Sequence, residues 1–225
     1  METTRQERAA LKPMEGSCYC TEAGMVACYR SAEDVILRKV PGVFVECGVA
    51  YGGMAGCMAA AMIDHKDLRP FHLFDSFQGI PIAGPRDTYQ PGVSAKIADD
   101  SEPQRARLRP SGIGPAVSLA DVRNRMIELY GLGSIPWEFH EGWFQDTLPT
   151  ADTGPIALLH LDGDLYESTL VCLEYLYPRV SPGGLVIIDD YELDGCREAV
   201  EDHFKGYAPS LIPWADYGSR YMVKL

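Results

Sequence analysis

The chain alternates short, uninterrupted apolar runs with longer stretches of helical periodicity. Continuous apolar runs are typical of strands that helices cover on both faces. The alternation therefore predicts an α/β protein with a doubly wound, mostly parallel sheet. The predicted strands are Val43–Val45, Phe71–Phe74, Trp137–His140, Ile156–Leu161, Gly184–Ile188 and Tyr221–Leu225.

Helices are predicted between these strands, and the first forty residues read as an N-terminal helical segment. Ser31–Asp34 resembles the start of a helix with a capping box, and Pro41 and Gly42 stop that helix. Val43–Ile63 is apolar, but it contains Glu46 and four glycines, so we expect a strand, a turn and a helix rather than a membrane span. The later predicted helices are Asp121–Tyr130, Ser168–Tyr177 and Gly195–Phe204.

Residues 80–116 differ from the rest because they are rich in proline and glycine and lack periodicity. A long unpatterned segment inside a compact domain is usually functional or disordered. We expect a mobile lid over the site, with a solvated surface insertion as the alternative. The length of 225 residues predicts a single domain, 1–225, that includes this lid and the N-terminal segment 1–40.

Composition limits the partners. The net charge of −12 repels phosphate backbones and anionic lipid, so neither a nucleic acid nor a membrane is expected. The seven cysteines contain no CxxC pair, which excludes zinc-ribbon and thioredoxin motifs. Cys18 and Cys20 are separated by one residue. We expect free thiols and a cytoplasmic protein without a signal peptide, because Met1–Lys12 is polar.

Carboxylates follow four of the predicted strands: Glu46, Asp75, Asp162, and Asp189 with Asp190. Ligands of such sheets bind beyond the carboxyl ends of the strands. The coincidence predicts a functional site at this rim. The alternative is that these carboxylates cap helices or balance basic side chains.

Adjacent strands that end in carboxylates bring like charges together, which costs free energy unless a cation joins them. Hard oxygen ligands without His or Cys favour Mg²⁺ over zinc. We therefore expect Asp162, Asp189 and Asp190 to bind Mg²⁺. The alternative is a salt-bridge cluster with arginines such as Arg197 or Arg220.

The turn Glu46–Gly53 lacks the GxGxxG spacing of dinucleotide-binding proteins, which disfavours an NAD-dependent oxidoreductase. Glu46 suits a ligand with positive charge or many hydroxyls, and S-adenosylmethionine (SAM) carries an ammonium and a sulfonium. Asp75 is placed to accept both ribose hydroxyls. The alternative for Asp75 is a turn cap through Ser76.

Five segments, in this order, resemble the macrocin O-methyltransferase (TylF-like) family, and the likeness extends from about residue 40 to 204. This resemblance implies a class I SAM-dependent methyltransferase of natural-product (antibiotic) biosynthesis that methylates a sugar hydroxyl and uses Mg²⁺. It also implies a homo-oligomer, a dimer or larger. The segments are Glu46–Gly53, Leu73–Pro81, Glu141–Pro149, Leu161–Thr169 and Val186–Tyr191.

The resemblance also implies roles for individual residues. Asp162, Asp189 and Asp190 would bind the metal, and Asp164 would be the general base that takes the proton of the acceptor hydroxyl. The alternatives for Asp164 are a loop-fixing carboxylate or a fourth metal ligand. The residues expected to line the cofactor are Glu46, Gly48, Val49, Gly52, Gly53, Asp75, Ser76, Phe77, Ser118, Gly142, Trp143 and Asp162.

Other interpretations remain open from the sequence. Asp162-Gly-Asp164-Leu also looks like the nucleophile motif of a haloacid-dehalogenase phosphatase, although too little chain follows it for that domain. A non-catalytic SAM-binding protein is another alternative. His160 stands where the family often has arginine, and we expect a core histidine with a hydrogen-bond partner, with contact to the acceptor as the alternative. Trp143 has a core role as its alternative.

Overall fold

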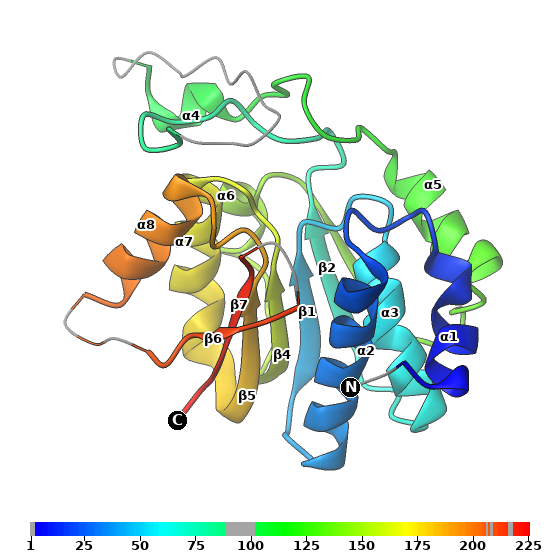
Figure 1. The fold of residues 1–225 in the computed structure, drawn as a ribbon. Helices are drawn as coiled ribbons and strands as arrows, with labels where there is room; N and C mark the ends of the chain where they lie inside the picture. Colours follow the sequence, from blue (N-terminus) through cyan, green and yellow to red (C-terminus); the bar gives the residue numbers. More distant parts are fainter. Residues whose placement is uncertain (1–2, 89–101, 206, 208, 216–217) are drawn as a thin grey trace.

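The computed structural model describes residues 3–88, 102–205, 207, 209–215 and 218–225. A seven-stranded sheet of order β3-β2-β1-β4-β5-β7-β6 lies between helices on both faces (Figure 1). The five strands from β3 to β5 are parallel, and β7 is antiparallel to both β5 and β6. The predicted doubly wound, mostly parallel sheet is therefore confirmed. The strands are β1 (Val43–Cys47), β2 (Phe71–Asp75), β3 (Trp137–Glu141), β4 (Ile156–Leu161), β5 (Val180–Ile188), β6 (Ile212–Pro213) and β7 (Arg220–Val223).

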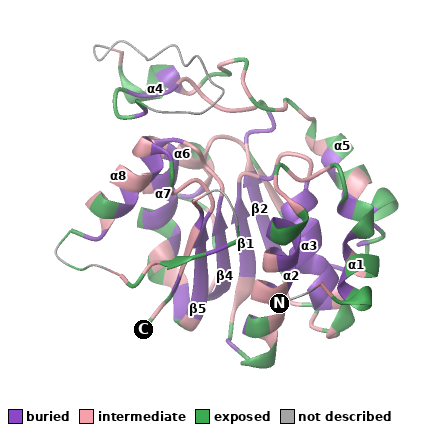
Figure 2. Ribbon diagram, viewed as in Figure 1, coloured by how far each residue is buried: buried purple, intermediate pink, exposed green. Residues whose placement is uncertain are grey.

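The apolar core has two parts, one on each face of the sheet. Phe44 of β1 packs in the part formed with α1, α2 and α3, whereas Val45 and Cys47 pack in the part formed with α7 and α8. Figure 2 shows the central strands buried between these layers. The helices are α1 (Arg5–Leu11), α2 (Glu22–Leu37), α3 (Gly53–Asp64), α4 (Gln104–Arg107), α5 (Leu119–Asn124), α6 (Phe144–Thr147), α7 (Tyr166–Leu176) and α8 (Asp194–His203), with short 3₁₀ or π turns η1 (Lys12–Met14), η2 (Arg125–Leu129) and η3 (Tyr177–Arg179).

The predicted helix start at Ser31–Asp34 is wrong. Helix α2 begins at Glu22, and the side chain of Thr21 caps it by accepting a hydrogen bond from the Gly24 N–H. Ser31 lies inside the helix and accepts a hydrogen bond from the Trp214 indole at 3.0 Å. A capping-type serine starts a helix only where the preceding chain is not already helical.

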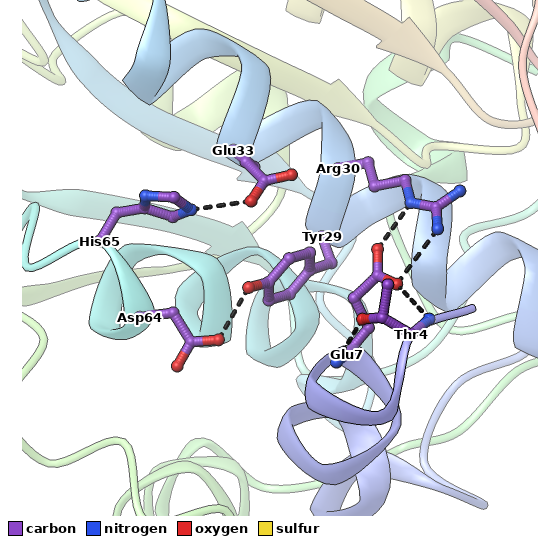
Figure 3. Close-up of polar contacts among 7 residues, drawn as sticks. All are labelled: Thr4, Glu7, Tyr29, Arg30, Glu33, Asp64 and His65. Atoms are coloured by element: carbon purple, nitrogen blue, oxygen red, sulfur yellow. Dashed lines mark hydrogen bonds and ion pairs between the residues drawn. The ribbon is translucent and has the colours of Figure 1, made fainter. Parts of the chain in front are cut away.

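An ion pair fixes helix α1 to α2, and a capping box begins α1 (Figure 3). The Glu7 carboxylate accepts a hydrogen bond from the Arg30 Nε at 2.6 Å and caps the Thr4 N–H. The Arg30 guanidinium lowers the pKa of Glu7 from 4.5 to about 2. Nearby contacts join α2 to the end of α3, and they are Tyr29 with Asp64 and His65 with Glu33.

The predicted lid, 80–116, is described only in part, because 89–101 lie outside the described residues. The described parts lie beyond the carboxyl ends of the strands (Figure 1). Asp87 accepts a hydrogen bond from the Tyr166 N–H at 2.8 Å, and Arg107 forms an ion pair with Glu167. Both contacts join this segment to α7. Its mobility and the single-domain boundaries stay predictions.

None of the described helices combines the length and the apolar character that a membrane crossing requires.

Candidate functional site

A cavity of about 340 Å³ lies at the carboxyl ends of the central strands, where the sequence predicted a site. This volume is within the usual range for one small-molecule ligand. Its walls come from the strand ends, the segment after β3 and the described parts of 80–116. The predicted residues that line it are Gly48, Asp75, Ser76, Gly142, Trp143, Asp162, Asp164, Asp189 and Asp190.

The rim of the cavity depends on the close approach of β1 and β4. The Asp162 N–H donates to the Cys47 carbonyl at 2.9 Å, immediately beyond the end of both strands. Gly48 has φ +90°, and a Cβ there would lie 1.8 Å from the Asp162 carbonyl oxygen. Only glycine fits this position, so Gly48 lets the turn pass against the Asp162 backbone.

Three carboxylates form the core of the site. Asp162, Asp164 and Asp190 each offer an oxygen such that all three atoms lie within 4.8 Å of one another. Asp164 has φ +56°, a left-handed conformation that is uncommon for residues other than glycine, and its N–H donates to Asp190 Oδ2 at 2.9 Å. The strained backbone is held by this bond, which brings Asp164 beside Asp190. We call these three residues the aspartate trio.

Burial and mutual repulsion shift all three acids in the same direction. Burial, followed by the charge of Asp190, raises the pKa of Asp162 well above its ordinary value. Burial, followed by Asp164, does the same to the pKa of Asp190. Burial and then Asp189 raise the pKa of Asp164 from 3.8 to about 6. Within the described part of the chain, no ion pair with lysine or arginine involves the trio. This donor set fits a hard divalent cation such as Mg²⁺.

Asp189, the third residue of the predicted metal set, lies outside the trio but lines the same cavity, and its Oδ1 accepts a hydrogen bond from the Ser219 hydroxyl at 3.3 Å. Its role as a metal ligand stays a prediction. The alternative salt-bridge cluster is not found among the described residues. Arg197 pairs with Asp194, and Arg220 donates to backbone carbonyls.

Asp75 organises the turn between β1 and α3. One carboxylate oxygen accepts hydrogen bonds from the N–H groups of Val49 and Ala50, at 2.7 and 3.0 Å, and the other from the Phe77 N–H at 2.7 Å. A carboxylate has about four acceptor positions. Asp75 therefore has room for about one more donor, so it can accept one ribose hydroxyl rather than the two that we expected of it.

Glu46 does not line the cavity, although it belongs to the predicted cofactor set. It is fully buried and lies opposite His160, whose Nδ1 is 3.0 Å from Glu46 Oε1. Burial raises the pKa of Glu46. Burial alone would lower the pKa of His160, but the hydrogen bond to Glu46 raises the pKa of this histidine overall. The expectation of a core histidine with a partner is confirmed. Glu46 Oε2 and His160 Nε2 have no hydrogen-bond partner among the described residues.

The remaining predicted cofactor residues do not line the cavity. Val49 and Phe77 contribute their backbone N–H groups to Asp75, and Ser118 caps α5 by accepting a hydrogen bond from the Asp121 N–H. Gly52 is the N-cap residue of α3, and Gly53 is the first residue of that helix.

Several cavity residues escaped the sequence analysis. Phe144 and Gln145 line the cavity and could have been found, because they lie within the quoted segment Glu141–Pro149. Ser168 lies in another quoted segment. Tyr19 also lines the cavity, but no local pattern marks it. The lining residues from the predicted lid are Ile80, Pro81, Ile113, Gly114 and Pro115.

Comparisons with known proteins agree with this geometry. A sequence model of the macrocin-O-methyltransferase (TylF) family matches residues 1–208. The chain is 42% identical over 201 residues to 8-demethyl-8-(2,3-dimethoxy-alpha-L-rhamnosyl)-tetracenomycin-C 4'-O-methyltransferase of Streptomyces olivaceus, covering 89% of this chain and 68% of the relative. It is 42% identical over 174 residues to demethyldecarbamoylnovobiocin O-methyltransferase of Streptomyces niveus, covering 76% and 61%.

Among solved structures, that of the O-methyltransferase NovP matches with a TM-score of 0.71 and 37% identity, covering 90% of this chain and 79% of NovP. The chain spans about two thirds of the length of the two Streptomyces relatives named above. The phosphatase and NAD-dependent alternatives are not supported, since the matched family is neither. The chain belongs to the macrocin-O-methyltransferase (TylF) family and has the fold and enzyme class of a SAM-dependent O-methyltransferase.

Proposed function

We propose that the protein methylates a hydroxyl group of a small-molecule natural product, a sugar or another vicinal diol, and that it requires Mg²⁺. The observation that carries this proposal is the aspartate trio beside the cavity, without a basic partner among the described residues. The activities for which two relatives are named, on a rhamnosyl tetracenomycin and on demethyldecarbamoylnovobiocin, support an acceptor of this class.

SAM would occupy the cavity and supply the methyl group. Asp75 accepts one ribose hydroxyl, and Gly142 and Trp143 flank the adenine. Gly48 keeps the wall open, because any side chain there would meet Asp162. Glu46 acts from behind the cavity wall, where its carboxylate pairs with the positive charge of His160. Positioning of the two reactants in this way can supply about 7 kcal/mol or more of the rate acceleration.

Asp162 and Asp190 hold the metal, with Asp189 at the wall of the same cavity. A bound Mg²⁺ supplies a Lewis acid and a template for two neighbouring oxygens of the acceptor. Such an ion also relieves the repulsion that raises the pKa values of these acids.

Asp164 accepts the proton of the acceptor hydroxyl. Its strained backbone and its bond to Asp190 fix it at the cavity wall. Its pKa of about 6 leaves the carboxylate ionised near neutral pH but more basic than an ordinary aspartate. The described parts of 80–116 cover the site and exclude water during transfer. We further propose a cytoplasmic homo-oligomer, a dimer in its simplest form.

Calorimetric titration with S-adenosylhomocysteine (SAH), the demethylated product of SAM, tests the proposal. We expect SAH binding in buffer with Mg²⁺, and Mg²⁺ binding that EDTA reverses and Asp190→Asn weakens. Asp34→Asn is the matched control, because Asp34 is an exposed partner of Arg38 far from the cavity. Absence of SAH binding would overturn the cofactor assignment, and full Mg²⁺ affinity in Asp190→Asn would overturn the metal site.

A further inference from the structure

Four sulfur atoms gather beside the N-terminal half of α3. Cys18 and Cys20 lie between η1 and α2, and Met54 and Cys57 lie one helical turn apart on α3. Cys20 Sγ is 3.3 Å from Met54 Sδ. The Cys18 thiol donates to the Met14 carbonyl at 3.8 Å, and it lies close enough to the Cys20 and Cys57 thiols for them to shift its pKa. We call these four residues the sulfur cluster. None of the four side chains lines the methyl-transfer cavity itself.

The backbone around the sulfur cluster is shaped for close approach. A Cβ at Gly53 would lie 2.5 Å from Cys18 Sγ, and one at Gly24 would lie 2.9 Å from the Cys20 Cβ. Each cysteine of the pair therefore packs against a glycine in a helix, where a larger residue would force it away. The two helices and the segment between them hold the sulfur atoms together in advance of any ligand.

The surroundings of the sulfur cluster favour a cation, and a cavity gives a cation access to the cluster. Cys57 is buried, whereas Cys18 and Cys20 are partly exposed. A cavity of about 290 Å³ reaches Cys20 and is lined by the carboxylates Glu15 and Glu22, with Arg8 as its basic residue. The Cys20 thiol alone would lower the pKa of Cys18, but the Cys57 thiol, burial and the charge of Glu46 raise it overall. This negative field opposes thiolates on their own and favours a cation among them.

The donor type and spacing select the kind of cation. Thiolate and thioether ligands prefer soft ions such as Cu(I). Tetrahedral zinc is disfavoured, because the aspartate trio is the one described group of three His, Cys, Asp or Glu ligands that all lie within 4.8 Å of one another. The three thiols do not form such a group, although Cys20 and Cys57 both act on the pKa of Cys18, so an ion of low coordination number fits them better.

We propose that the sulfur cluster binds one soft monovalent cation of the Cu(I) class, with Cys18 and Cys20 as thiolate ligands and Met54 and Cys57 beside them. Each coordinating thiol releases its proton to solvent, and the oxidation state of the ion does not change. Tyr19 lies between the two cysteines, and its ring stacks on Tyr51 with centroids 6.1 Å apart. Because Tyr19 lines the methyl-transfer cavity, the bound ion holds one wall of that cavity in place.

Anaerobic competition for Cu(I) between the full chain and the chelator bathocuproine disulfonate tests this site. We expect one equivalent of Cu(I) on the protein and an affinity at least about 100-fold lower in the double variant Cys18→Ser/Cys20→Ser, because two ligands are lost. The matched control is Cys172→Ser, which removes a thiol in contact with Cys47 on the other face of the sheet and leaves the affinity unchanged.

Circular dichroism and SAH binding show whether the double variant folds. If it does not, X-ray absorption of the copper-loaded wild-type protein decides, with a first shell of sulfur alone as the expected result. The proposal is overturned if the wild-type chain does not compete with the chelator, if the double variant keeps its affinity, if Cys172→Ser loses it, or if the first shell contains nitrogen or oxygen.

Discussion

Two groups of ionisable side chains lie near the ends of neighbouring strands, and they differ in how their charge is balanced. Glu46 and His160 are opposite one another within the sheet, fully buried, and each neutralises part of the other's charge. The aspartate trio lies just beyond the strand ends, with Asp162 after β4 and Asp190 after β5, opens to a cavity and has no basic partner among the described residues.

The comparison teaches that position relative to the end of the strand decides what an acid does. Inside the sheet, an acid must carry its own counter-charge, because burial without a partner costs several kcal/mol. Beyond the last backbone pairing, the cavity admits a ligand, so the counter-charge can come from outside the chain. In the function that we propose, Glu46 supports the site from behind and the trio contacts the ligands.

The largest expected effect concerns the aspartate trio. Asp164→Asn keeps the shape of the side chain but removes the proton acceptor, so we expect the turnover number to fall by about 10²–10⁴-fold. The measurement is methyl transfer under saturating SAM and Mg²⁺, with SAH and Mg²⁺ affinities measured beside it. Normal turnover in a variant that still binds both would refute the role of Asp164.

The second prediction concerns the buried pair of Glu46 and His160. His160→Leu leaves Glu46 buried without its partner, so we expect the free energy of unfolding to fall by about 3–5 kcal/mol. The double variant Glu46→Leu/His160→Leu removes both charges and should lose less than the single variant. Urea denaturation measures both. A double variant that is as unstable as the sum of the two single variants would contradict the pairing.

The third prediction uses the pH dependence of stability to test Asp164 of the aspartate trio. The pKa of Asp164 rises from 3.8 to about 6 on folding. The folded state therefore favours the protonated form of Asp164. The stabilisation that comes from this preference is present below pH 3.8 and is lost as the pH rises through 6. In metal-free protein, we expect this loss to reach at most about 3 kcal/mol. Thermal unfolding in EDTA between pH 4 and 7 measures it, and Asp164→Asn should flatten the profile.

The smallest effect concerns an ordinary ion pair far from both groups. Glu7→Gln removes the charge that pairs with Arg30, and we expect a loss of about 1–2 kcal/mol, since the Arg30 side chain is 29% exposed. The pKa of Glu7 is lowered from 4.5 to about 2, so its contribution is present above pH 4.5 and lost as the pH falls through 2. Acid titration of the folded state checks this, and Glu22→Gln, at an exposed pair with Arg8, is the control.

The sequence predicted the sheet and its rim because both depend on local pattern. Continuous apolar runs identify strands that are covered on both faces, and the acids that follow them must meet at one edge. The contact of the Asp164 backbone with Asp190 could not be predicted, because it depends on the left-handed backbone at Asp164. Neither could Tyr19 or the sulfur cluster, since Cys20 and Met54 are brought together by tertiary packing.

The central claim is that Asp162 and Asp190 of the aspartate trio hold a divalent ion beside the cofactor cavity. Crystals grown with SAH and Mn²⁺, a close substitute for Mg²⁺, test it most directly through anomalous scattering. The account predicts one strong anomalous peak, at about 2–2.3 Å from carboxylate oxygens of Asp162 and Asp190, with SAH next to it. A fully bound SAH with no manganese at these carboxylates would contradict the account.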